Sequence, residues 1–216
     1  MVKTNELKQM SFERIQNPQE RNQRDAHLNS EEGKDGAKTL ESLLEKYRDK
    51  RVLVLAPPSI GKSTMLQHIE NSVDLDTVFD DMPAEFKRHV LHHERPFMFI
   101  DGDKKTVKYV EKEFDPNNPE HQKYLRETTD LLTGYTQNKM PVEAGRPAFG
   151  AVLIDSDVVI YVKISDEEFR KRMESRNNNT HRLIQPERVL AIKNILEEDL
   201  EKARAEGRIV EEFEVR

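Results

Sequence analysis

Short runs of apolar residues alternate along the chain with apolar positions at helical spacing, which predicts an alternation of strands and helices. The run V-L-V-L at residues 52–55 is followed by the turn A-P-P at 56–58 and predicts a buried strand. Before it, apolar residues recur at helical spacing over residues 37–50, and after it residues 62–71 can form a helix. This part of the chain therefore has the order helix, strand, loop, helix.

The last third of the chain carries the same alternation. Residues 158–164 form an apolar run that predicts another buried strand. Ser165 and Glu168 have the spacing of a capping box, so we expect a helix to begin there. Apolar positions at helical spacing over residues 186–206 predict a long amphipathic helix, and the alternating residues 209–215 predict a final strand.

Between these parts, two stretches compete for the remaining strands, and each ends in a pair of carboxylates. Residues 97–103 are an apolar run that ends in D-G-D, and residues 77–83 are a shorter run that ends in two aspartates and Met-Pro. One of them is the second strand and the other is the third strand or an insertion; the sequence leaves both assignments open. Further on, helical spacing over residues 124–132 predicts a helix, and residues 139–143 are a candidate additional strand.

Composition limits the classes of protein to which the chain can belong. It has 216 residues, of which 35% are apolar and 35% charged, and this suits one α/β domain with a compact core. No cysteine is present, so disulfides, thiolate catalysis and cysteine metal sites are excluded. The net charge of −6 disfavours a nucleic-acid partner, and without a long apolar run we expect no membrane partner. We therefore expect a soluble, cytoplasmic protein.

The first 36 residues differ from the rest of the chain because they are polar, of mixed charge, and contain only scattered apolar positions. A segment of this composition has little apolar surface to bury. We therefore expect residues 1–36 to be a flexible N-terminal segment and residues 37–216 to be the folded domain. Removal of the segment should leave a folded core that binds nucleotide.

The nine residues A-P-P-S-I-G-K-S-T at 56–64 carry the most specific chemical signal in the sequence. In a P-loop, backbone N–H groups between a strand and a helix cradle phosphates, the lysine neutralises the terminal phosphates, and the Ser/Thr hydroxyl binds Mg²⁺. Ala56 replaces the usual first glycine, and Pro57 and Pro58 have no N–H to donate. The expected nucleotide-binding residues are Ser59, Ile60, Gly61, Lys62, Ser63 and Thr64, with Ser63 also holding Mg²⁺.

With this loop, the strand at residues 158–164 and the helix that follows it, the chain resembles small P-loop kinases of the nucleotide-, nucleoside- and shikimate-kinase kind. The resemblance implies a three-layer αβα sandwich with a mainly parallel sheet and helices on both faces. It also implies that an R-x-x-x-R pair, here Arg172 and Arg176, supplies lid arginines. The two side chains lie one helical turn apart, where both can reach one phosphoryl group. The polar residues 177–182 are then expected to form a loop or lid.

A kinase also needs carboxylates close to the lysine. We expect Asp101 to hold Mg²⁺ and Asp103 to orient the acceptor hydroxyl or take its proton. The reason is that D-G-D would emerge at the carboxyl end of a sheet strand, where ligands bind in open α/β sheets. Asp80 and Asp81 are the competing pair.

These features favour an ATP- and Mg²⁺-dependent kinase that moves the γ-phosphoryl of ATP to a small-molecule acceptor, such as a nucleoside or nucleotide. Tyr135 and Arg146 are candidates for recognising that acceptor. Two alternatives stay open: a P-loop transferase that resembles the tRNA prenyltransferases, and a module that binds ATP without turnover. His89, His92 and His93 have helical spacing, and we expect a solvated helix face there rather than a metal site.

Overall fold

The computed structural model describes residues 31–58, 60–66, 68–79, 82–83, 86, 98–103, 106–111, 114–180 and 185–214. At its centre is a five-stranded, all-parallel sheet with the strand order β2-β5-β1-β6-β7. The strands are β1 (Val52–Leu55), β2 (Val73–Asp74), β5 (Ala148–Gly150), β6 (Val158–Lys163) and β7 (Ile209–Glu214). The fold class is therefore α/β, as the sequence predicts.

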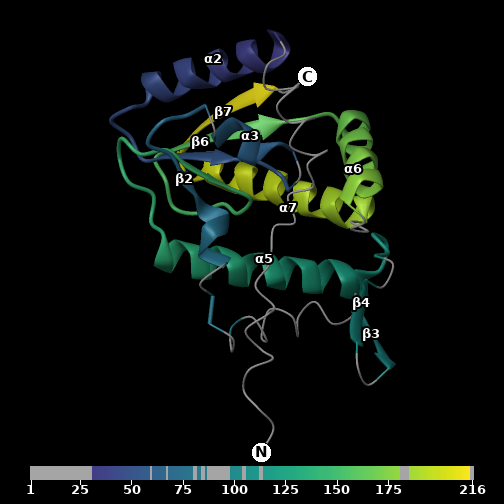
Figure 1. Cartoon of the computed structure of the whole chain (residues 1–216). Coiled ribbons are helices and arrows are strands. Elements are labelled where there is room, and N and C mark those ends of the chain that lie inside the picture. The colour runs from purple at the N-terminus through teal and green to yellow at the C-terminus, as the bar shows by residue number, and fades with distance from the viewer. Residues whose placement is uncertain are drawn as a thin grey trace, which may run out of the picture.

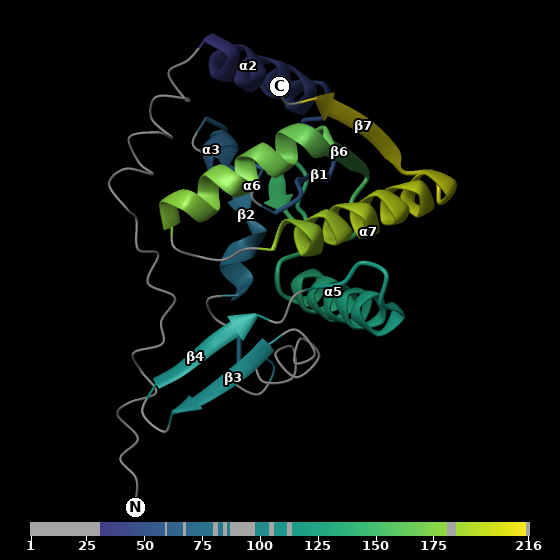
Figure 2. The ribbon, with the colours of Figure 1, turned by 90° about the vertical axis from the view of Figure 1, so that its right-hand side faces the viewer.

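Helices cover both faces of this sheet, which makes the fold a three-layer arrangement (Figures 1 and 2). One face carries α2 (Glu31–Lys46), α3 (Lys62–Leu66) and α6 (Asp166–Thr180). The opposite face carries α7 (Pro186–Ala205), and α5 (Pro119–Lys139) packs beside α7. Among the described residues, no helix combines the length and the apolar character needed to cross a membrane.

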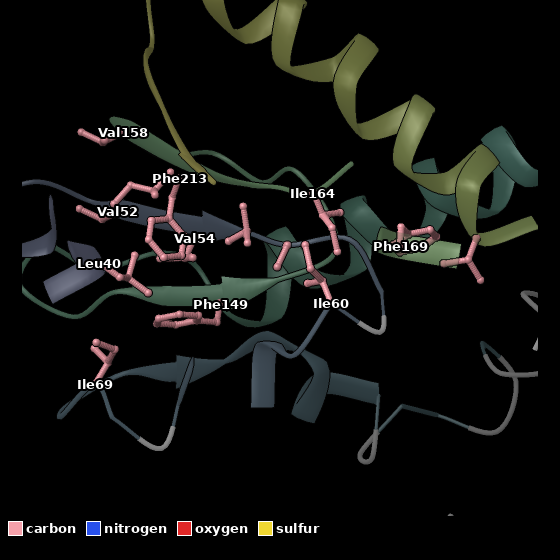
Figure 3. Close-up of a cluster of buried hydrophobic side chains, with 14 of the residues drawn as sticks. Leu40, Val52, Val54, Ile60, Ile69, Phe149, Val158, Ile164, Phe169 and Phe213 are labelled. Carbon is pink, nitrogen blue, oxygen red and sulfur yellow. The ribbon is translucent and has the colours of Figure 1, made fainter. Parts of the chain in front are cut away.

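The alternation of side chains along each strand divides the core into two clusters, one on each face of the sheet. In β1, Val52 and Val54 point into the cluster shown in Figure 3, whereas Leu53 and Leu55 belong to the cluster on the other face. All four residues are buried, with at most 3% of their surface exposed. A strand buried on both faces has to be apolar throughout, which is why β1 reads as a continuous apolar run.

The strand order places a topological switch point at the carboxyl ends of β1 and β5. These two strands are neighbours, but the chain leaves β1 towards β2 on one side and leaves β5 towards β6 on the other. Where consecutive connections diverge in this way, the loops leave a crevice in which ligands of open α/β sheets bind. The segment that follows β1, with the G-K-S sequence, therefore lies at the expected ligand-binding edge.

Two predicted strands have a different place in the structure. Residues 98–103 do form a strand, β3 (Met98–Asp103), but it pairs antiparallel with β4 (Thr106–Glu111) in a separate two-stranded sheet. Figure 2 shows this hairpin set apart from the five-stranded sheet. The stretch at 77–83 was predicted to be a strand, and this is wrong for its first residues, which belong to the 3₁₀ helix η2 (Leu75–Phe79).

Turn chemistry explains why the second strand of the sheet is so short. The carboxylate of Asp74 accepts a hydrogen bond of 3.0 Å from the backbone N–H of Asp76, and the Thr77 hydroxyl donates to the Asp74 carbonyl at 2.7 Å. Short polar side chains that bond to nearby backbone in this way favour turns over extended chain. β2 consequently ends at Asp74. The third strand of the sheet in chain order is β5. Residues 139–143, the candidate additional strand, contain instead the end of α5 and an isolated β-bridge from Glu143 to Arg146.

The other predicted elements differ from the observed ones mainly at their ends. The Ser165 hydroxyl caps α6 by accepting from the Glu168 N–H at 3.2 Å, as the capping-box spacing predicts. α6 continues to Thr180, so the prediction of a loop from residue 177 is wrong for residues 177–180. α3 ends at Leu66, earlier than predicted. α2 starts at Glu31, before the proposed boundary at residue 36, and its Leu40 is 1% exposed in the core.

One buried hydroxyl on α5 gives a test of the packing. Oγ1 of Thr136 is buried and has no hydrogen-bond partner among the described residues. We expect Thr136→Val to raise the free energy of unfolding by about 1 kcal/mol, because valine has a similar shape and removes an unsatisfied polar group. Urea denaturation measures the change. Thr133→Val, at a half-buried position of the same helix, should give no comparable gain, and a loss of stability in Thr136→Val would contradict the packing described.

Candidate active site

The chain turns sharply between β1 and α3. The Ala56 N–H donates to the Gly150 carbonyl at 2.9 Å, which holds the exit of β1 beside the end of β5. Gly61 has φ +103°, and α3 begins with the next residue, Lys62. A Cβ at Gly61 would meet no atom within 4 Å, so this backbone angle, and not lack of space, is what requires a glycine here.

Lys62 lies almost completely inside this turn. Its side chain is 10% exposed, and its Nζ lies 3.1 Å from Oδ1 of Asp74. Nζ also forms an ion pair with Oδ2 of Asp76. The Asp74 side chain is 18% exposed and that of Asp76 is 40% exposed, so the cluster opens towards solvent on the side of Asp76. A buried ammonium is costly unless negative charge compensates it, and here two carboxylates do so.

The parallel sheet is what brings these three residues together. β2 pairs with β5, and β5 pairs with β1, so the carboxyl ends of all three strands meet at one edge. Asp74 is the last residue of β2, Asp76 follows in η2, and Lys62 begins the helix after β1. Since strand and helix ends are held by the surrounding core, the cluster rests on rigid elements.

Arg172 reaches the same turn from α6. Its Nη1 donates to the carbonyl of Ile60 at 3.1 Å, and its Nε donates to Oε1 of Glu168 at 3.0 Å. Ile60 is 2% exposed, and the Arg172 side chain is 22% exposed. The structure therefore brings a second cation, predicted from the sequence as a lid arginine, against the segment that contains Lys62.

Of the other predicted nucleotide-binding and lid residues, the structure describes the backbone position of some, and the others lie outside the described residues. Ser63 and Thr64 belong to the first turn of α3, and Arg176 lies one turn beyond Arg172 in α6. Ser59 lies outside the described residues, as do Asp80, Asp81 and the three histidines at 89, 92 and 93. For all of these residues, the roles expected from the sequence remain predictions.

The expected position of the carboxylates predicted to serve the lysine needs a correction, while their roles remain predictions. Asp101 and Asp103 were expected at the carboxyl edge of the main sheet, and this is wrong because β3 belongs to the separate hairpin. Within the part of the chain that the structure describes, the acidic residues that contact Lys62 are Asp74 and Asp76. Asp74 and Asp76 are not among the residues predicted from the sequence, although D-L-D after the β-branched Val73 is a signal that points to them.

The two candidates for acceptor recognition lie in different places. The Tyr135 ring stacks on that of Phe86, with centroids 4.4 Å apart and an interplanar angle of 27°. Arg146 lies in the turn before β5, at the amino edge of the sheet and so at the opposite end from Lys62. A hollow of about 420 Å³ opens at that same amino edge, lined by residues such as Tyr47, Val52 and Pro147. Arg146 and this hollow are therefore not part of the candidate site.

The arrangement places Lys62 with Asp74 and Asp76, and Arg172 with Glu168, at the carboxyl edge of a parallel sheet. Ammonium and guanidinium groups suit phosphate oxygens, and carboxylate oxygens suit Mg²⁺. In comparisons with known proteins, neither a family model nor a curated protein matches the chain. The groups gathered around Lys62 are therefore the basis on which a function can be proposed.

Proposed function

We propose that the chain is an ATP-dependent phosphotransferase that moves the γ-phosphoryl of Mg·ATP to a hydroxyl of a small-molecule acceptor. The observation that carries this proposal is the ion-pair cluster of Lys62 with Asp74 and Asp76, at the switch point of an all-parallel sheet. A phosphate-binding cation beside two carboxylates is the combination that phosphoryl transfer needs, because that reaction is catalysed mainly by positioning and charge.

The residues present fit a triphosphate. Lys62 supplies a compact ammonium at the start of a helix, directly after a glycine in the left-handed region. In this proposal the backbone N–H groups of residues 60–64 face the phosphate oxygens, since Pro57 and Pro58 have none to donate. Arg172 donates to the carbonyl of Ile60 and places a second positive charge beside the transferred group.

The carboxylates fit Mg²⁺ and the acceptor. Mg²⁺ takes oxygen ligands and, when bound, neutralises charge that develops on the phosphate oxygens. We assign Asp74 to its water shell, because its carboxylate is already fixed by the Asp76 N–H, and we keep Ser63 as the predicted hydroxyl ligand. Asp76 is the more exposed of the pair and is assigned to the acceptor.

The step itself balances as follows. The acceptor oxygen forms a bond to the γ-phosphorus while the bond from that phosphorus to the β–γ bridging oxygen breaks, and ADP leaves with the electron pair. Asp76 accepts the proton of the acceptor hydroxyl. Lys62 and Arg172 stabilise the negative charge on the transferred group. The chain's own residues thus supply every role apart from the metal.

The experiment that tests the proposal is a screen for ADP formation from Mg·ATP in the presence of nucleosides, nucleotides, shikimate-like acids and sugars. We expect one acceptor class to stimulate ADP release and to yield a phosphorylated product by mass spectrometry. ATP binding by calorimetry without ADP release for any acceptor would favour the module without turnover. Absence of ATP binding would overturn the proposal.

A further inference from the structure

We propose that Glu168 is a positioning residue, which holds the guanidinium of Arg172 in a fixed orientation against the turn that carries Lys62. This inference rests on the proposed phosphotransferase function for its consequence in catalysis, but the geometry that supports it is independent of that function. It assigns a role to a residue of α6 that otherwise looks like an ordinary helix-surface glutamate.

Two hydrogen bonds from different nitrogens orient the Arg172 side chain. Nε donates to Glu168 Oε1 at 3.0 Å, and Nη1 donates to the Ile60 carbonyl at 3.1 Å, across 112 residues of sequence. A guanidinium is planar and rigid, so two bonds in different directions define the orientation of the whole group. Either bond alone would define this orientation less completely.

Glu168 is itself well anchored for this purpose. Its backbone N–H donates to the capping hydroxyl of Ser165 at 3.2 Å, which fixes the first turn of α6. Further along this helix, Phe169 and Met173 are fully buried against the sheet and hold the register of the helix. The carboxylate of Glu168 is 36% exposed and the Arg172 side chain 22%, so the pair lies at the border of the protein interior.

The same helix offers a matched comparison. Glu167 and Lys171 form an ion pair of 2.9 Å with the same four-residue spacing, but their side chains are 81% and 64% exposed. A pair of that kind contributes little beyond local helix stability. The Glu168–Arg172 pair differs because its arginine also contacts the turn before Lys62.

Loss of the Glu168 carboxylate should therefore affect turnover and ATP binding differently. Without the carboxylate, the arginine regains rotamer freedom that has to be lost again in the transition state, so turnover should fall. Affinity for ATP should not fall, because removing a negative charge near the phosphates does not oppose their binding. Glu168→Gln keeps an oxygen that can accept from Nε, so it should restore much of the orientation.

We would test this with steady-state kinetics on Glu168→Ala, Glu168→Gln and the control Glu167→Ala. We expect kcat to fall roughly tenfold to a hundredfold in Glu168→Ala with KM for ATP unchanged or lower, and to recover largely in Glu168→Gln. Glu167→Ala should behave as wild type. In the Arg172→Ala background, Glu168→Ala should cause no further loss, because its effect passes through the arginine. Additive losses, or an unchanged kcat in Glu168→Ala, would overturn the inference.

A second readout separates failure of this inference from failure of the proposed function. The NMR signal of the Arg172 Nε–H should be protected from exchange with water in wild type and lose that protection in Glu168→Ala but not in Glu167→Ala. If wild type shows no phosphoryl transfer, the proposed function fails while this measurement still decides the positioning. An Arg172 signal that is equally unprotected in all three proteins would refute the positioning whatever the activity.

Discussion

Lys62→Ala is expected to weaken ATP binding by at least about a hundredfold, because it removes the buried ammonium that the phosphates would contact. The loss should exceed that of any other single substitution in the turn, since Lys62 has a side chain only 10% exposed and so meets little competing water. Isothermal titration with ATP, with and without Mg²⁺, measures the effect. Lys62→Arg should rescue poorly, because a planar guanidinium does not fit where a compact ammonium lies.

The same substitution should also lower stability, which the sequence alone does not suggest. From the sequence, Lys62 looks like a lysine aimed at an empty anion site, with few contacts to lose. In the structure it separates two carboxylates, and its removal leaves Asp74 and Asp76 as neighbouring negative charges. We expect a loss of about 1–2 kcal/mol, limited by the exposure of Asp76 to solvent.

A matched control for Lys62→Ala is Lys171→Ala, which removes the same charge from an exposed position of α6. It should leave ATP affinity unchanged and alter the free energy of unfolding by less than about 0.5 kcal/mol. Unchanged ATP binding in Lys62→Ala, with a folded protein by circular dichroism, would refute the assignment of the turn as a phosphate site.

Asp74→Asn and Asp76→Asn are each expected to raise the affinity for metal-free ATP and to lower turnover. In wild type the two carboxylates hold the Lys62 ammonium and therefore compete with the phosphates of metal-free ATP. Replacing one by a neutral amide should raise the affinity for metal-free ATP several-fold, by about 1 kcal/mol. Turnover with Mg²⁺ should fall by about two to three orders of magnitude, because a metal ligand or the acceptor's base is lost.

The contrast between the two kinds of variant makes this prediction specific. Lys62→Ala should lose ATP binding with and without Mg²⁺, whereas Asp76→Asn should gain it without Mg²⁺ and lose only catalysis. Asp49→Asn, at a side chain that is 90% exposed, serves as the neutral control. Full turnover in both Asp74→Asn and Asp76→Asn would contradict the roles proposed for these two residues. It would favour Asp101 and Asp103 instead, whose substitution should be measured in parallel.

Much of the framework follows from local patterns in the sequence. The apolar runs of β1 and β6 predict buried strands, and the helical spacing in α7 and the cap of α6 predict helices close to their observed positions. These elements can be predicted from the sequence because each is defined by periodicity and capping among residues within a few positions of one another. The turn at Gly61 and Lys62 is readable for the same reason.

The carboxylate partners of Lys62 could not be identified in this way. β2 has two residues, too few for any periodicity, and its place in the sheet depends on pairing with β5, where Val73 lies opposite Ala148, 75 residues later in the chain. The more conspicuous apolar run that ends in Asp101 and Asp103 pairs instead with its neighbour β4. Local pattern therefore predicts the longer strands and helices, whereas long-range strand pairing decides which acidic residues meet the lysine.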